Sequence, residues 1–153
     1  MSKHLLVVHH TPSPATQEIL EAVLGGTRAE GIEGVEVVVH PALSATASDL
    51  LAADGVLLGT PANIGYMSGA LKHFLDTIYY PTLEARRGLP FGYWVHGNND
   101  VEGASRAVET IAGALGWALV AKPLKVTGPV DGAVRAAAEE LGATLAATLM
   151  EGT

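Results

Sequence analysis

Residues 54–80, DGVLLGTPANIGYMSGALKHFLDTIYY, give the clearest indication of the fold of this 153-residue chain. It opens with a continuous apolar run of strand length, passes through a loop containing Pro and Gly, and continues with apolar residues at helical spacing. The apolar face of that helix recurs at intervals of three and four residues: Met67, Ala70, Leu71, Phe74, Leu75, Ile78 and Tyr79. A buried strand followed directly by an amphipathic helix is the repeating unit of folds with a parallel sheet.

The same alternation of strand and helix runs through the rest of the chain. Apolar runs of strand length occupy residues 4–9, 35–40, 54–59, 89–96 and 117–121. Helical periodicity covers residues 16–24, about 44–53, 67–79, 104–115 and 134–149. We expect the first helix to end at Gly25–Gly26 or at the later Gly31. Because continuous apolarity indicates strands covered on both faces, we predict an α/β three-layer sandwich: a five-stranded parallel sheet with helices on both faces, residues 1–153 forming one domain.

Composition excludes several classes of function. The formal charge of −7 leaves no broad positive face for nucleic acid or an anionic membrane. The chain has no cysteine, which excludes a disulfide scaffold, a thiolate metal site and a Cys nucleophile. No apolar stretch is long enough to span a membrane, so we expect a cytoplasmic protein. A small anionic cofactor remains compatible with these numbers, because backbone amides can hold a phosphate without net positive charge.

In a parallel sheet, ligands bind beyond the carboxyl ends of the strands, so the loops after the first, third and fourth strands are the candidate site. The first loop, HHTPSPATQ at residues 9–17, offers hydroxyls at Thr11, Ser13 and Thr16. With the amides of residues 15–17 at the helix start, these could surround a phosphate; the alternative is a capped helix after a proline turn. The chain has neither a GxxxxGK[ST] nor a GxGxxG sequence, so ATP and dinucleotide sites of those types are unsupported.

At the second loop the chain resembles a known family. GTPANIGYMSGALKHFLD, residues 59–76, is similar to the Gly-[Thr/Ser]-Pro…Gly-x-Met-Ser-Gly…Lys-x-Phe-Leu-Asp segment of flavodoxin-like proteins, specifically the NADPH-dependent FMN reductases and the related NAD(P)H:quinone reductases. The resemblance implies the strand order 2-1-3-4-5. The first loop looks like the flavodoxin phosphate loop Thr-x-[Thr/Ser]-Gly-x-Thr, with Pro14 in place of the usual Gly.

This resemblance implies FMN as cofactor and assigns three groups of residues to it. The phosphate group comprises His10, Thr11, Ser13, Ala15, Thr16 and Gln17. The ring would be supported by Pro61, Ala62, Asn63, Ile64 and Gly65, and its pyrimidine side by His96, Gly97 and Asn98. His96 stands where the family often has Ser or Thr; it could still donate a hydrogen bond, and if protonated it would favour reduced FMN. Without the resemblance, residues 97–99 are an ordinary turn before a helix.

The flavin would carry the chemistry, so no catalytic side chain is expected. No metal site is expected either, because the adjacent His9 and His10 point to opposite sides of a strand and no carboxylate pattern joins them. The resemblance implies an oxidoreductase that passes a hydride from NADPH or NADH through FMN to a quinone or other small acceptor. Arg86–Arg87 could meet the phosphates of the nicotinamide cofactor or could belong to a solvated loop.

Two other functions stay open at this stage. One is a flavodoxin-type carrier of single electrons with FMN and no nicotinamide site. The other is an interaction module that has lost its flavin, an alternative suggested by Pro14. The resemblance also implies a homodimer or homotetramer.

Overall fold

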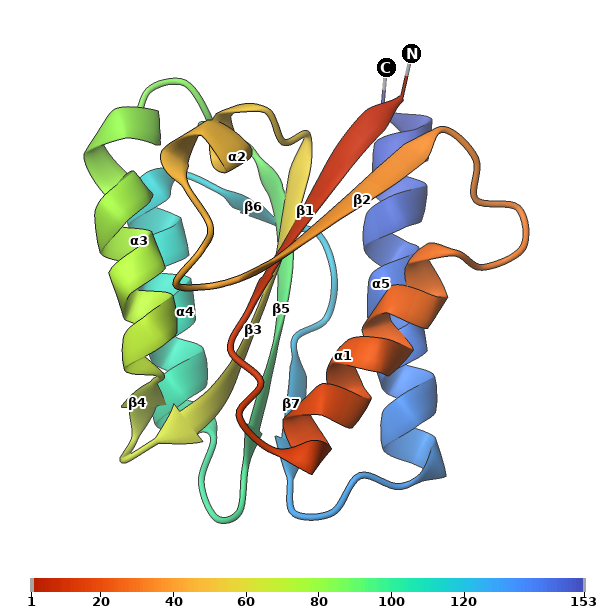
Figure 1. Cartoon of the computed structure of the whole chain (residues 1–153), viewed down its shortest axis with the longest axis vertical. Coiled ribbons are helices and arrows are strands. Elements are labelled where there is room, and N and C mark those ends of the chain that lie inside the picture. The colour runs from red at the N-terminus through yellow and green to blue at the C-terminus, as the bar shows by residue number, and fades with distance from the viewer. Residues whose placement is uncertain (1, 153) are drawn as a thin grey trace.

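The computed structural model of the chain describes residues 2–152. The strands are β1 (Lys3–His9), β2 (Val35–Pro41), β3 (Gly55–Asn63), β4 (Tyr66–Met67), β5 (Pro90–Gly97), β6 (Ala118–Leu119) and β7 (Leu124–Thr127). The helices are α1 (Pro14–Thr27), α2 (Ala47–Leu51), α3 (Gly69–Thr82), α4 (Glu102–Leu115) and α5 (Gly132–Glu151). Strand and helix alternate as the apolar runs predict (Figure 1).

The main strands form one parallel sheet in the order β2-β1-β3-β5-β6. In register, Val7 of β1 lies between Val39 of β2 and Leu57 of β3. The strand β4 is a short antiparallel addition to β3. Counting only the five parallel positions, the predicted order 2-1-3-4-5 and the three-layer α/β fold are confirmed.

The fifth strand position is divided. The predicted strand over residues 117–121 forms only at β6, which pairs with the start of β5, while β7 pairs with the end of β5. Pro123 lies between them, and a proline has no N–H to donate to the neighbouring strand. The apolar run therefore marks only the first half of this edge of the sheet.

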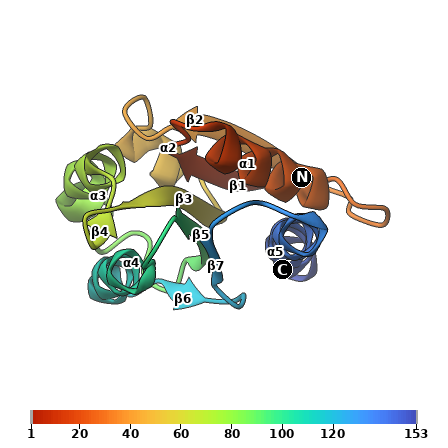
Figure 2. The same ribbon diagram turned by 90° about the horizontal axis from the view of Figure 1, so that it is seen from below.

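Helices cover both faces of the sheet, with α3 and α4 on one side and α1 and α5 on the other (Figure 2). The predicted end of α1, at Gly25–Gly26 or at Gly31, is wrong in both alternatives, because the helix ends at Thr27. A β-carbon on Gly26 would lie 1.9 Å from the carbonyl oxygen of Glu139 in α5, and one on Gly142 would lie 2.0 Å from that of Val23. Gly26 thus serves the close approach of two helices and does not terminate α1.

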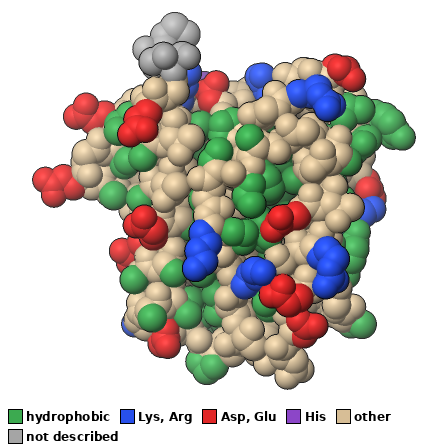
Figure 3. Space-filling model, turned by 180° about the vertical axis from the view of Figure 1, so that it is seen from behind, with side chains coloured by type: hydrophobic (Ala, Val, Ile, Leu, Met, Phe, Trp, Pro, Cys, Tyr) green, Lys and Arg blue, Asp and Glu red, His purple; other side chains and the backbone are tan. Residues whose placement is uncertain are grey.

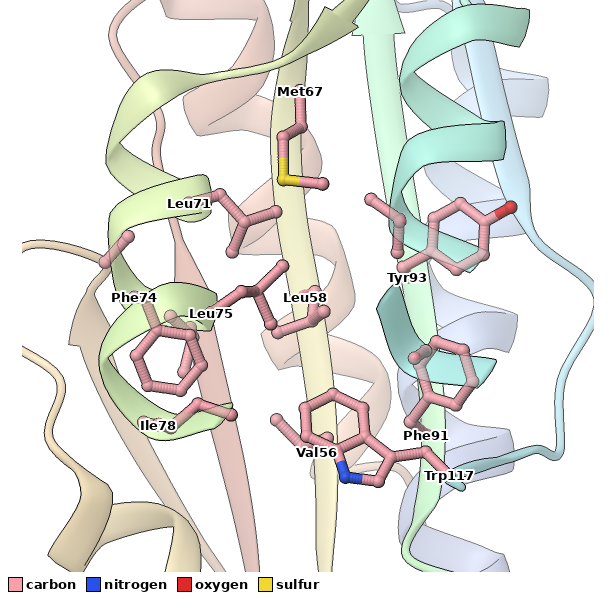
Figure 4. Packing of buried hydrophobic residues seen from close by; sticks show 14 of the residues in the cluster. Val56, Leu58, Met67, Leu71, Phe74, Leu75, Ile78, Phe91, Tyr93 and Trp117 are labelled. Carbon is pink, nitrogen blue, oxygen red and sulfur yellow. The ribbon is translucent and has the colours of Figure 1, made fainter. Parts of the chain in front are cut away.

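The core lies in two layers, one on each side of the sheet. Figure 4 shows the layer under α3 and α4, where Leu58, Leu71 and Phe74 are among the fully buried side chains. The alternating faces of β3 divide its residues between the layers, with Val56 and Leu58 in one and Leu57 in the other. This packing holds the carboxyl ends of the strands at one edge.

Charges of both signs are interspersed around an apolar area on the face seen in Figure 3. No helix within residues 2–152 is both long enough and apolar enough to cross a bilayer.

Candidate functional site

The three candidate loops meet at the carboxyl edge of the sheet, the lower edge in Figure 1. The amide of His10 donates to the carbonyl of Gly59 (3.0 Å), which ties the end of β1 to β3. Pro61 and His96 are register partners on β3 and β5. The predicted loops are therefore neighbours in space.

The first loop ends in a closed capping box at the start of α1. Ser13 is the N-cap; its Oγ accepts from the amide of Thr16 (3.2 Å), and its own amide donates to Thr16 Oγ1 (3.1 Å). Thr16 Oγ1 also donates to the carbonyl of Ser13 (3.0 Å), and the Thr16 side chain is buried. The hydroxyls of Ser13 and Thr16, both expected to face a phosphate, are thus engaged with each other.

Few backbone donors remain at this helix start. The amide of Gln17 donates to Ser13, Thr16 is engaged in the box, and Pro14 has no N–H. Of the three amides expected to bind a phosphate, only that of Ala15 has no hydrogen bond within residues 2–152, and the amide of Thr11 is also open.

The side chain of His9 contacts the hydroxyl of Thr11 in this loop. Its Nδ1 lies 3.1 Å from Thr11 Oγ1. Burial, together with the neighbouring His10, lowers the pKa of His9 below its usual 6.5. The neutral ring that this favours can accept from Thr11 or donate to it.

The second loop is a β-hairpin rather than an irregular loop. Residues Ala62–Asn63 of β3 pair with Tyr66–Met67 of β4. The turn residues Ile64 and Gly65 both have positive φ, 48° and 74°, as a type I′ turn requires. Such a φ is rare for a β-branched residue, and the Ile64 side chain is fully exposed (105%).

Two hydroxyls fasten the hairpin to α3. The amide of Ser68 donates to Thr60 Oγ1 (2.9 Å), and Ser68 Oγ accepts from the amide of Leu71 as the N-cap of α3. Both side chains are buried. The Thr and Ser of the resembling segment therefore hold the backbone that would carry the ring.

The third loop is fixed by a buried histidine. His96 is 8% exposed, and its Nε2 donates to the carbonyl of Gly128 after β7 (2.8 Å). The amide of Gly128 in turn donates to the carbonyl of Gly97 (2.8 Å). One ring nitrogen of His96 thus has a structural role, while Asn98 is exposed.

The hairpin is in direct contact with the end of β5 at Gly97 and with α4 at Gly103. A β-carbon on Gly97 would lie 3.2 Å from that of Ala62. One on Gly103, in the first turn of α4, would lie 2.1 Å from the carbonyl oxygen of Gly65. Sequence reasoning missed Gly103; its only signal is a glycine where a helix would prefer another residue.

Trp94 is a second residue that sequence reasoning missed. It is fully buried and is the register partner of Gly59, where a β-carbon would meet its ring at 2.0 Å. Gly59 pairs in turn with His9, the last residue of β1. Trp94 is therefore at the same level of the sheet as the residue from which the first loop begins. Its Nε1–H has no hydrogen-bond partner within the described chain.

Arg86 and Arg87 lie at the opposite, amino-terminal edge of the sheet. They line a cavity of about 200 Å³ with Ala53 and Asp54, which precede β3. Arg86 donates to the carbonyl of Leu51 at the end of α2. This pair does not adjoin the three loops.

Two cavities flank the outer face of α4. One, of about 270 Å³, lies against the hairpin and includes Gly65, Tyr66 and Gly103. The other, of about 400 Å³, includes Glu102, Glu109 and Lys125. Arg106 and Thr110 line both. Another cavity, of about 540 Å³, lies away from the site between residues 120–125 and α5.

Comparisons with known proteins bear on the family and the fold of this chain. The family model of the NADPH-dependent FMN reductases matches residues 14–125. A flavodoxin of Aquifex aeolicus is 36% identical over 74 residues, which cover 48% of this chain and 39% of that protein.

Solved structures with the same fold include a flavodoxin from the domain Archaea (TM-score 0.83, 17% identity, 97% of this chain and 99% of that one). A flavodoxin, WrbA-like protein from Agrobacterium tumefaciens superposes with a TM-score of 0.79 at 20% identity, covering 99% of this chain and 100% of that one.

Proposed function

This chain belongs to the NADPH-dependent FMN reductase family, and on that premise we propose that it is an enzyme in which bound FMN takes electrons from NADPH or NADH and delivers them to a quinone or another small acceptor. The observation that carries the proposal is the hairpin of residues 61–67, held by buried Thr60 and Ser68 beside the start of α4.

The residues present fit the phosphate of FMN. The open amide of Ala15 lies in the first turn of α1, a helix of 14 residues whose N-terminus carries partial positive charge, and the open amide of Thr11 lies in the loop before it. The Thr11 hydroxyl, oriented by His9, adds a third group. Residues 9–17 contain no Asp or Glu, so none of the carboxylates behind the net charge of −7 belongs to this loop.

The ring would be held by backbone of the hairpin and of the third loop. Residues 61–65 and 96–98 supply amides and carbonyls at the same edge, and the turn at Ile64 exposes an apolar side chain toward which a flat ring can pack. His96 would position the third loop through its bond to Gly128, and its other ring nitrogen could face the pyrimidine side. FMN, when bound, supplies the redox chemistry, so the protein needs no nucleophile of its own.

A single-electron carrier is a second candidate, supported by the identity with the Aquifex aeolicus flavodoxin. We favour the reductase, because residues 97–101 contain no aromatic side chain to cover the flavin. A homodimer or homotetramer is part of the proposal and is tested by light scattering.

The decisive experiment is an anaerobic titration. The purified protein is mixed with FMN, its visible spectrum is recorded, and NADPH or NADH is then added, followed by a quinone. Bleaching by a nicotinamide and recovery with the quinone support the reductase. A flavin that binds but is bleached by neither nicotinamide supports the carrier, and failure to bind FMN overturns both.

A further inference from the structure

The strand β2 is an open edge of the sheet. It pairs with β1 on one side and, within residues 2–152, with no strand on the other. In Figure 2 it lies at one margin of the molecule, with no helix beyond it. Its seven residues, VEVVVHP, include four valines, and none of the seven is fully buried. The unpaired backbone N–H and C=O groups of such an edge can form hydrogen bonds with another strand.

The opposite edge of the sheet has features that hinder such pairing. Its strands are short, with two residues in β6 and four in β7. Pro123 separates them, and Lys122 and Lys125 lie on either side of this proline in the sequence. Short strands, proline and lysine are the usual means by which proteins keep an edge unpaired. In contrast, β2 has no lysine or arginine, and its one proline, Pro41, is its last residue.

The sequence of β2 is complementary to itself in the antiparallel direction. When two copies are paired about Val38, all seven residues of one strand lie opposite the seven of the other. Glu36 then lies opposite His40 of the second copy, and Val37 lies opposite its Val39. Moving the centre to Val37 or to Val39 would instead place Glu36 or His40, respectively, opposite Val38. Only the centre at Val38 therefore pairs valine with valine and carboxylate with imidazole, which are the favourable cross-strand combinations.

Glu36 and His40 lie on the same face of β2, because side chains alternate along a strand. Each contacts an ionisable group of its own chain: Glu36 Oε2 is 3.1 Å from His4 Nε2, and His40 Nε2 is 3.6 Å from Asp49 Oδ1. Pairing about Val38 would join the two contacts into one row across the interface, in which imidazole and carboxylate alternate. Glu36 also lines a cavity of about 230 Å³, so the space beside it is open.

We propose that β2 pairs antiparallel with β2 of a second copy, centred on Val38, and so joins two sheets into one. The inference rests on the proposed function only for the homo-oligomer, whose interface it specifies, and it does not depend on the flavin. Antiparallel pairing directs the carboxyl edges of the two sheets to opposite ends of the dimer. Both flavin sites therefore stay open, and FMN should bind the dimer and the single chain with the same affinity.

Disulfide cross-linking tests the pairing directly, because the chain has no cysteine of its own. In Val38→Cys the two introduced thiols would lie opposite each other at the dimer axis, within reach of a disulfide. In Val39→Cys, the matched control on the same strand, they would be displaced by about 7 Å along the strands, which is too far for a disulfide. Under mild oxidation the first variant should form a covalent dimer, and the second should not.

Charge reversal tests the register independently. His40→Glu places two glutamates opposite each other, and Glu36→Lys places a lysine opposite His40. Each change should raise the dimer dissociation constant about ten-fold or more, as measured by sedimentation velocity. An equal mixture of the two variants should dimerise as the wild type does. In the mixed dimer the new lysine lies opposite the new glutamate, and the other pair is the original Glu36 and His40.

Three results would overturn the proposal. These are a wild type that sediments as a single chain at the highest soluble concentration, cross-linking of Val39→Cys in preference to Val38→Cys, and a mixture of the charge variants that does not dimerise. Titration of the same samples with FMN tests the proposed function separately. A cross-linked Val38→Cys dimer that binds no FMN would refute the proposed function while supporting this interface, and FMN binding to a chain that never dimerises would do the reverse.

Discussion

The carbonyl oxygen of Gly65 occupies the space where residue 103 would carry a β-carbon, 2.1 Å from its ideal position. The turn of the hairpin is thus pressed onto the first turn of α4, and only glycine permits this contact. Because α4 follows the third loop, the contact fixes two of the three candidate loops relative to each other.

Gly103→Ala should therefore displace the hairpin, weaken FMN binding and destabilise the protein by about 1–3 kcal/mol, the usual cost of overpacking. Gly113→Ala is the matched control on the same helix, since nothing lies within 4 Å of its β-carbon. That change should stabilise the chain by about 0.5–1 kcal/mol. Urea unfolding and FMN titration measure both effects; similar behaviour of the two variants would contradict the contact.

Ile64→Asn should stabilise the hairpin, because Asn-Gly is the preferred pair for a type I′ turn. Removing a β-branched residue from φ 48° should raise the free energy of unfolding by about 1 kcal/mol. The control is Leu43→Asn, which removes another exposed apolar side chain (68%) outside the residues of positive φ. If Ile64 packs on the flavin ring, Ile64→Asn should also lower FMN affinity, whereas unchanged affinity would count against that role.

Pro14→Ala should strengthen FMN binding about two- to ten-fold, because it adds one N–H at the start of α1, where a phosphate would accept it. Pro81→Ala, in the last turn of α3, is a control that adds an amide far from the loops. Fluorescence titration of FMN gives the two dissociation constants. If Pro14→Ala binds FMN with the same affinity as the wild type, the phosphate of FMN does not bind at the start of α1.

Acid should destabilise the protein through His9. The folded-state pKa of His9 lies below the 6.5 of an ordinary histidine, so the unfolded chain binds more protons at this position. The contribution to stability is complete above about pH 6.5 and is lost as the pH falls through the folded-state pKa. His9→Gln keeps a hydrogen-bonding group near Thr11 but cannot titrate there.

Thermal midpoints of the wild type and His9→Gln, compared at pH 8 and at pH 5.5, measure this dependence. The wild type should lose more stability on acidification than the variant does. Parallel losses would show that other groups dominate the acid response.

Much of the fold could be predicted because its signals are local. The continuous apolar runs of β1 and β3 and the apolar face of α3 each lie within one short stretch of chain, where burial on both faces or on one face determines the pattern. The predicted end of a helix was wrong where that helix packs closely on another. From the local sequence, Gly26 is typical of a helix end. In the structure it is a glycine because α5, more than a hundred residues away in sequence, packs directly against it.

In the candidate site, too, some features could be predicted from the sequence and others could not. The order of strands and helices along the chain was enough to predict which loops gather at one edge, because parallel strands place their carboxyl ends together. The contacts of individual side chains emerge only in the folded chain: Ser13 and Thr16 bond each other, His96 donates to Gly128, and Arg106 adjoins the hairpin while Arg86 does not. Periodicity reports whether a side chain is buried, whereas the partner of a polar group depends on distances between segments remote in sequence, which no local pattern encodes.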